Sequence, residues 1–150
     1  MGVHAIQSTA QPEDFHADQT FDFIYVGSLF THLPDHLFRR WLNRLYELLT
    51  PNGILAFTTH GPGHLKAGVT MPAEGIYYIP ETEIPSLDPE VYGATIVTPE
   101  YVKKLFRTLL KALIFDIRSA RSHSGKTCGS YLGSRCQLRL FCTIRDHRGT

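Results

Sequence analysis

The chain has 150 residues, of which 43% are hydrophobic and 19% are charged, so its composition is that of a folded globular protein rather than a disordered one. Its formal net charge of +1 removes the simplest case for a nucleic-acid-binding protein. No apolar run reaches the roughly 18 residues that span a bilayer. The length fits one domain or part of a larger one, and we expect neither a nucleic-acid nor a membrane partner.

The carboxyl-terminal quarter of the sequence differs from the rest. It contains all three cysteines, at Cys128, Cys136 and Cys142. An odd number of cysteines without a secretory signal favours reduced thiols, and we expect a cytoplasmic protein. Residues 1–113 carry 8 basic and 12 acidic groups, whereas residues 114–150 carry 7 basic and 2 acidic groups. This break predicts one domain, with its core in residues 1–118 and a divergent basic tail over residues 119–150.

Two strands are expected near the start of the chain. Val3–Ile6 is a short candidate, followed by turn-forming residues that include Pro12. Phe21–Val26 is a stronger one, because it is β-branched and aromatic, almost continuously apolar, and ends at Gly27. Such a run is typical of a strand that is covered on both faces in a parallel α/β sheet. The Tyr25 ring is expected in the core or, in the alternative, in the wall of a substrate site.

The best helix pattern begins at Pro34 and Asp35. Its apolar side chains recur every three or four residues, at Leu37, Phe38, Trp41, Leu42, Leu45, Leu48 and Leu49. This spacing places them on one face, which would pack on a sheet. Pro51 is expected to end the helix, and Asn52–Gly53 to form a turn into a buried strand over Ile54–Thr59. Strand, helix and strand within about 40 residues predict a right-handed parallel βαβ unit.

The remainder of the chain is less regular. Residues 60–97 show no periodicity and contain five prolines, so we expect a long irregular loop that covers a site. A second helix follows, with Thr98 as its N-cap and a proline in its first turn. Two final strands are expected at Ile114–Ile117 and Leu138–Ile144, with a loop over residues 119–136 between them.

Two stretches of the βαβ unit carry a family resemblance. Phe21–Leu33 reads FDFIYVGSLFTHL, and Leu49–Gly61 reads LTPNGILAFTTHG. Together they resemble the class I S-adenosylmethionine-dependent methyltransferases. In that family an FD-x-I strand is the fourth of the sheet, an S-x-x-x-H-L turn follows it, and L-x-P-G-G-x-L leads into the fifth strand. Asn52–Gly53 stands where the family has Gly-Gly, a mild change because both residue types tolerate positive φ. Tyr92–Gly93, ahead of the second helix, resembles the family's later half.

The resemblance implies an α/β fold with a partial doubly wound, Rossmann-like, mostly parallel sheet. The family's glycine-rich loop and the acidic residue that holds the cofactor ribose are both absent from this sequence. The chain therefore resembles the carboxyl-terminal part of such a domain, without its amino-terminal cofactor-binding loop. In the family's strand order, 3-2-1-4-5-7-6, the Phe21–Val26 strand is then left with an open apolar edge. We expect self-association through that edge.

The cofactor implied by the resemblance is S-adenosylmethionine. Four residues after the Phe21–Val26 strand would line its methionine arm, namely Gly27, Ser28, Leu29 and Phe30. Ser8 and Thr9 match the place where the family touches adenine, with Val3–Ser8 as its third strand. The competing interpretation of the turn at Gly27 is a plain strand-to-helix connection.

Two histidines are candidate functional residues. His32 follows the carboxyl end of a strand, where ligands bind in open α/β sheets. An imidazole there is suited to act as general base for an acceptor hydroxyl or amine. The alternative is a histidine that bonds to backbone at the helix entrance. His60 ends the next strand and is expected on the substrate side, beneath the long loop.

Two further patterns are weaker. His60 and His64 are four residues apart, but the proline and glycines around them exclude a helix, and the cysteines lack C-x-x-C pairing, so we expect no metal site. Ala120–Thr127 fits a loose phosphate-loop pattern. A phosphate site needs a helix amino terminus, and the residues that follow are a poor helix, so we interpret the match as chance.

The expected function is methyl transfer from S-adenosylmethionine to an oxygen, nitrogen or carbon of a small-molecule substrate, with His32 as catalytic base. The first alternative is a catalytically inactive remnant or interaction module, which the missing cofactor loop favours. The second is a phosphate-loop nucleotide binder that depends on Lys126.

Overall fold

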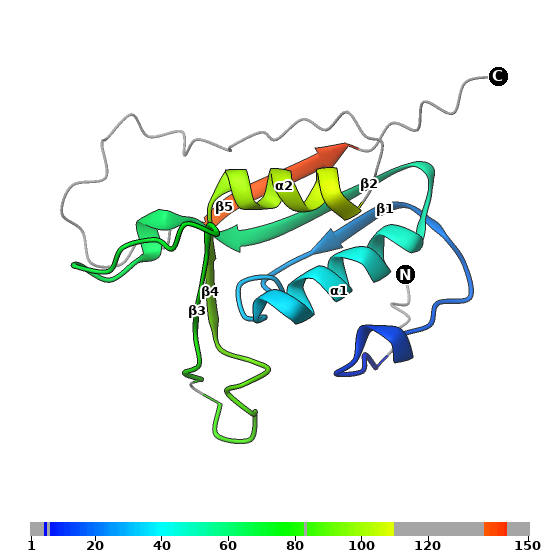
Figure 1. Cartoon of the computed structure of the whole chain (residues 1–150). Coiled ribbons are helices and arrows are strands. Elements are labelled where there is room, and N and C mark those ends of the chain that lie inside the picture. The colour runs from blue at the N-terminus through cyan, green and yellow to red at the C-terminus, as the bar shows by residue number, and fades with distance from the viewer. Residues whose placement is uncertain (1–4, 6, 83, 110–136, 144–150) are drawn as a thin grey trace.

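The computed structural model describes residues 5, 7–82, 84–109 and 137–143 (Figure 1). The elements in chain order are η1 (Pro12–Asp14), β1 (Phe21–Val26), α1 (Asp35–Glu47), β2 (Leu49–His60), η2 (Pro62–His64), β3 (Ile76–Ile79), β4 (Ala94–Val97), α2 (Pro99–Leu109) and β5 (Gln137–Thr143). The prediction of an α/β fold is confirmed, and so are the bounds of β1 and the presence of both helices. None of the helices in the described ranges is long and apolar enough to cross a membrane.

The sheet is built around β2. This strand pairs in parallel with β1 and β4 and antiparallel with β5, and β3 pairs antiparallel with β4. His60 pairs with both Gln137 of β5 and Ile96 of β4, so β4 lies on the same edge of β2 as β1, past the point where β1 ends. The parallel pairing of β1 with β2 across α1 confirms the predicted βαβ connectivity.

The link between α1 and β2 differs from the prediction. The helix ends at Glu47, ahead of Pro51, and β2 is one strand that runs from Leu49 through the expected turn. Phe21 pairs with Leu49 but Phe23 already pairs with Ile54, so Pro51–Gly53 lie in a bulge. A Cβ on Gly53 would lie 2.9 Å from the Phe21 carbonyl oxygen, and this close approach requires glycine.

Both described helices cover the same face of the sheet. Phe57 of β2 lies 6.4 Å from Phe38 of α1 and 6.2 Å from Phe106 of α2, measured between ring centroids. On the opposite face, the side chains of Phe23 and Tyr25 are 57% and 58% exposed. The predictions that β1 is covered on both faces and that Tyr25 belongs to the core are therefore wrong. The expectation of a buried strand holds for β2, in which every residue from 55 to 59 is buried.

Residues 60–97 are more ordered than predicted. The short strands β3 and β4 pair from Ile76 with Val97 to Ile79 with Ala94, and they extend from the rest of the sheet as an arm (Figure 1). We call residues 76–97 the arm. The prediction of a long irregular loop is wrong for β3 and β4. Two four-residue strands separated by a proline-rich stretch are too short to show a clear alternation of apolar and polar residues.

The second helix starts as predicted. The Thr98 hydroxyl accepts a hydrogen bond of 3.1 Å from the Tyr101 N–H, which is the N-cap arrangement. The final predicted strand is confirmed as β5. The strand predicted at Ile114–Ile117 and the phosphate-loop match at Ala120–Thr127 lie outside the described residues, as does most of the Val3–Ile6 strand. Within the described part of that first segment, Ala5 and residues 7–9 have no regular structure.

Candidate functional site

A cavity of about 320 Å³ lies where β1 and β2 end. Its lining residues come from the turn after β1, from the end of β2, from η2 and from the arm: His32, His60, His64, Glu81, Thr82, Ile84, Tyr92, Gly93 and Ala94. We call this cavity the histidine pocket. The carboxyl ends of parallel strands are where open α/β sheets bind ligands, so both its place and its contents favour a functional site. The structure brings the two predicted histidines, His32 and His60, together in it.

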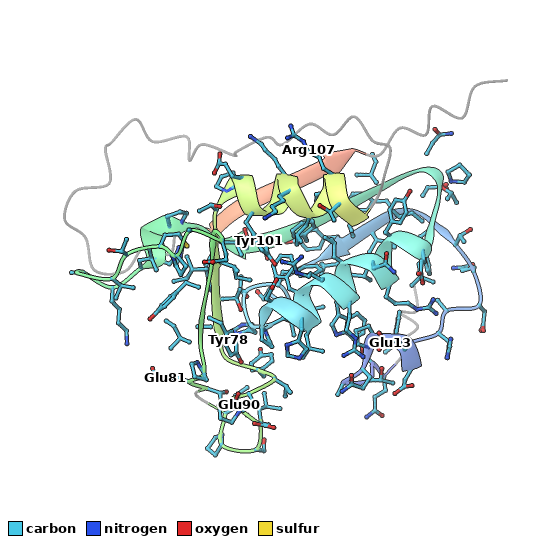
Figure 2. All side chains as sticks on the ribbon, in the orientation of Figure 1. Glu13, Tyr78, Glu81, Glu90, Tyr101 and Arg107 are labelled. Atoms are coloured by element: carbon cyan, nitrogen blue, oxygen red, sulfur yellow. The ribbon has the colours of Figure 1, made fainter. Side chains whose placement is uncertain are left out.

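A larger open groove, of about 400 Å³, runs over the outer side of α1. It is lined by charged residues that already pair with one another. Arg40 pairs with Glu13, and Arg44 pairs with Glu47 at 3.1 Å (Figure 2 labels Glu13). The hydrogen bond from Arg40 lowers the pKa of Glu13, as an ion pair should. Because these charges satisfy each other, we place the candidate site in the smaller histidine pocket.

His32 is held by Gly93 of the arm. The ring nitrogen Nδ1 lies 2.8 Å from the Gly93 carbonyl oxygen, and the Gly93 N–H donates to the His32 carbonyl oxygen at 2.9 Å. A carbonyl oxygen can only accept, so Nδ1 carries the proton and neutral His32 keeps a lone pair on Nε2. The two roles expected for His32, a hydrogen bond to backbone and general-base catalysis, are therefore compatible, because the first uses Nδ1 and the second uses Nε2.

The surroundings of His32 are closely tied together. Its ring stacks on Tyr92, with centroids 4.4 Å apart and planes 12° apart. The Thr95 N–H donates to the Thr31 carbonyl oxygen at 2.8 Å, and the Thr95 hydroxyl donates to the Leu33 carbonyl oxygen. A Cβ on Gly93 would clash with the carbonyl oxygen of the opposite strand. Glycine is therefore required at this position for β3 to lie beside the residue that orients His32.

The arm is braced internally as well. The Tyr78 hydroxyl donates to the Pro89 carbonyl oxygen at 2.6 Å, which ties β3 to the loop that precedes β4. Burial, with the nearby Glu90 and Asp88, raises the pKa of Tyr78 and keeps this hydroxyl protonated. Figure 2 shows Tyr78, Glu81 and Glu90 along the arm.

His60 and His64 form a second pair of rings in the pocket, with centroids 4.4 Å apart. The chain between them folds back through the single 3-10 turn η2, in which the His64 N–H donates to the Gly61 carbonyl oxygen at 3.0 Å. The Nε2 atom of His64 is buried and has no hydrogen-bond partner among the described residues. The residues between His60 and His64 do not form an α-helix, and the Pro-Gly turn of η2 brings the two rings together instead. Within the described ranges, no three His, Cys, Asp or Glu side chains are grouped to hold a metal ion.

The residues predicted to bind the cofactor lie outside this pocket. Gly27 and Ser28 are exposed in the turn after β1, Leu29 packs against the core, and the Phe30 side chain is fully buried. Ser28 has a left-handed φ of 62°, and its N–H donates to the Thr58 hydroxyl at 2.9 Å. Only the surface of Gly27 and Ser28 is therefore open to a ligand.

Ser8 and Thr9 are exposed and lie beside α1. The Thr9 hydroxyl donates to the Gln11 carbonyl oxygen at 2.6 Å, and the Gln11 side chain accepts from Arg40 of α1 at 2.9 Å. These contacts run along the helix rather than at the carboxyl ends of the strands. The structure thus does not bring the proposed adenine contacts to the histidine pocket.

Comparisons with known proteins give a fold but no sequence relative. No family model matches the chain, and no curated protein matches it. In structure it is similar to the 1,6-didemethyltoxoflavin-N1-methyltransferase of Burkholderia thailandensis, which was solved with 1,6-didemethyltoxoflavin and S-adenosylhomocysteine bound. The TM-score is 0.54 and the sequence identity 13%, over 90% of this chain and 48% of that one. The chain thus spans about half the length of that protein, and the likeness shows a Rossmann-like α/β fold.

The described residues do not by themselves fit S-adenosylmethionine. The Phe30 side chain belongs to the core, and the Ser28 N–H is already bonded to Thr58. The sequence has neither the glycine-rich loop nor the ribose-binding acidic residue of the family. The turn after β1 therefore supplies one small wall for such a cofactor and not a complete site.

Proposed function

We propose that this chain is the acceptor-binding part of a methyltransferase domain, and that the histidine pocket holds a small-molecule acceptor. The observation that carries the proposal is the meeting of His32 and His60 in one cavity beneath the arm, at the carboxyl ends of β1 and β2. The structural neighbour is a methyltransferase crystallised with S-adenosylhomocysteine, which supports S-adenosylmethionine as the methyl donor.

His32 is the residue we propose as general base. Its Nε2 would take a proton from the hydroxyl or amine of the acceptor. The bond from Nδ1 to the Gly93 carbonyl oxygen, 2.8 Å long, holds the required tautomer and would stabilise the imidazolium that forms. The stacked Tyr92 ring limits rotation of the imidazole. Gly93 and Tyr92 would then act as positioning residues rather than catalytic ones.

The test is calorimetric titration of the folded, monodisperse chain with S-adenosylhomocysteine. Because the turn after β1 is only one wall of a cofactor site, binding requires that a second copy of the chain complete that site. Micromolar binding supports the proposal, and Gly27→Asp should weaken it about tenfold or more by placing a carboxylate on the exposed turn, a change of about 1.4 kcal/mol. A Cβ at Gly27 makes only ordinary contacts, of 3.4 Å to the Tyr25 ring, so the variant should fold. Asn52→Asp is the matched control, because it adds the same carboxylate to an exposed residue of the bulge at the other end of β2.

Absence of binding by a folded chain would favour the second candidate, a catalytically inactive interaction module. One observation favours that candidate directly: Phe23 and Tyr25 expose more than half of their surface on the uncovered face of β1. Equal binding to the Gly27→Asp and Asn52→Asp variants would show that any cofactor site lies away from the turn.

A further inference from the structure

Four rings surround the histidine pocket in two pairs. His32 stacks on Tyr92 with planes 12° apart, and the rings of His60 and His64 lie 4.4 Å apart with planes 36° apart. The pairs come from different elements, one from the turn after β1 and the arm, the other from β2 and η2. Each ring has one face that its partner does not cover, and on such a face a flat ligand gains stacking and dispersion contacts that a puckered one loses.

The one carboxylate among the described lining residues lies at the rim of the pocket. Its carboxylate, Glu81, is 3.9 Å from the Lys66 ammonium, and both side chains are about three-quarters exposed. No lysine or arginine is among the lining residues that the structure describes. A phosphate or carboxylate would meet no lysine or arginine in this lining and would lie near the Glu81 carboxylate, so the pocket selects against anionic ligands.

One ring nitrogen of the pocket is suited to contact a ligand. His32 has Nε2 as an acceptor, since its Nδ1 donates to Gly93. The Nε2 atom of His64 is buried, so the His64 ring would contribute packing contacts rather than a hydrogen bond. A ligand with a hydroxyl or amino group would donate to Nε2 of His32. The cavity, at about 320 Å³, is at the small end of ligand sites, which range from about 300 to 1,000 Å³.

Building on the function proposed above, we propose that the acceptor is an uncharged aromatic or heteroaromatic molecule of one or two fused rings that carries a hydroxyl or amino group. Its ring would lie among the four aromatic side chains. Its polar group would face Nε2 of His32. The site would thus distinguish its ligand by planarity first and by lack of charge second.

The test uses three probes of similar carbon skeleton: 2-naphthol, its saturated analogue decahydro-2-naphthol, and 2-naphthyl phosphate. Each is titrated into the full chain with labelled histidines, and the imidazole signals are followed by NMR. We expect 2-naphthol to shift the His32 and His64 signals and to bind at least tenfold more tightly than the other two. His36, exposed on α1, should not move. Equal binding of the saturated alcohol or of the phosphate would overturn the proposal.

Variants distinguish probe binding in the histidine pocket from probe binding to the exposed Phe23 and Tyr25 side chains of β1. Tyr92→Leu and His64→Ala should each weaken 2-naphthol binding about fivefold or more, whereas His36→Gln and Phe23→Ser should leave it unchanged. Weakening by Phe23→Ser alone would place the probe on β1 and contradict the proposal. Because no methyl donor is present, failure here with intact S-adenosylhomocysteine binding rejects only the acceptor class. Probe binding without S-adenosylhomocysteine binding would instead reject the methyltransferase function.

Discussion

The neighbouring strands β1 and β2 read alike in sequence but are buried differently. Leu55 and Phe57 of β2 face the helices, and Ala56 and Thr58 face the other way, yet all four are at most 2% exposed. In β1, the residues directed at the helices pack against the core, while Phe23 and Tyr25 on the far face are more than half exposed. An apolar strand is therefore not always a covered strand. Its neighbours in the sheet, and what lies over each face, decide its burial.

The largest expected effect on stability is the difference between removing a phenylalanine from the helix-covered face of the sheet and removing one from the opposite face. Phe57 is 1% exposed and contacts three other phenylalanines, so Phe57→Ala should cost about 3–5 kcal/mol of unfolding free energy. Phe23→Ala removes the same group from the open face and should change it by about 0.5 kcal/mol or less. Urea unfolding of both variants, at a concentration low enough for the chain to be monomeric, measures the difference. Similar losses would mean that the far face of β1 is covered in solution.

The next prediction concerns what the open face does. We propose that β1 mediates self-association through its exposed aromatics. Phe23→Ser with Tyr25→Ser should weaken it about tenfold or more, since burying each ring contributes roughly 1.5–3 kcal/mol. Sedimentation velocity measures the effect. The control, Ile84→Ser with Val91→Ser, alters two exposed apolar residues of the arm and should leave association unchanged. A sharp cooperative melt of a monomeric wild-type chain at micromolar concentration would contradict the proposal.

A smaller effect is expected at the start of α2, which covers the other face. Thr98→Ala removes the hydroxyl that caps the Tyr101 N–H and should cost about 1 kcal/mol. Thr108→Ala is the matched control, because its exposed hydroxyl bonds only to the Lys104 carbonyl oxygen within the same helix. Thermal unfolding distinguishes the two. Equal shifts in Tm would argue against the capping role.

The smallest prediction tests a link between the two covering helices. Asp35 of α1 accepts hydrogen bonds from Arg39 and from the Tyr101 hydroxyl of α2, and Tyr101 lies where the helices face each other (Figure 2). Partial burial opposes ionisation of Asp35, but these bonds outweigh it and lower its pKa below the ordinary 3.8. Burial, together with Asp35, raises the pKa of Tyr101, so its hydroxyl stays a donor.

The sign of the pH dependence follows from that shift. A lowered folded-state pKa stabilises the fold at pH values above 3.8, and this contribution is lost as the pH falls through the folded-state pKa. Asp35→Asn should therefore lose less unfolding free energy than wild type between pH 7 and pH 3. Chemical denaturation at the two pH values measures this. Identical losses would show that the link does not stabilise the ionised form.

Local patterns in the sequence were sufficient for several elements. The bounds of β1, the apolar face of α1 and the Thr98 cap depend on residues within a few positions of one another, so periodicity and capping chemistry reveal them. The family pattern likewise placed His32 and His60 after two strands whose carboxyl ends share one edge of the sheet. This was enough to predict His32 as a candidate base and His60 on the substrate side, and the structure brings the two into one cavity.

Only the tertiary structure decided which other groups join that site. Tyr92 stacks on His32 from 60 residues further along the chain, and Gly93 fixes its tautomer, because β4 pairs beside the end of β2. The same holds for the open face of β1. Whether an apolar residue is buried, or a histidine has a partner, depends on segments that are distant in sequence, and local propensity carries no information about where those segments pack.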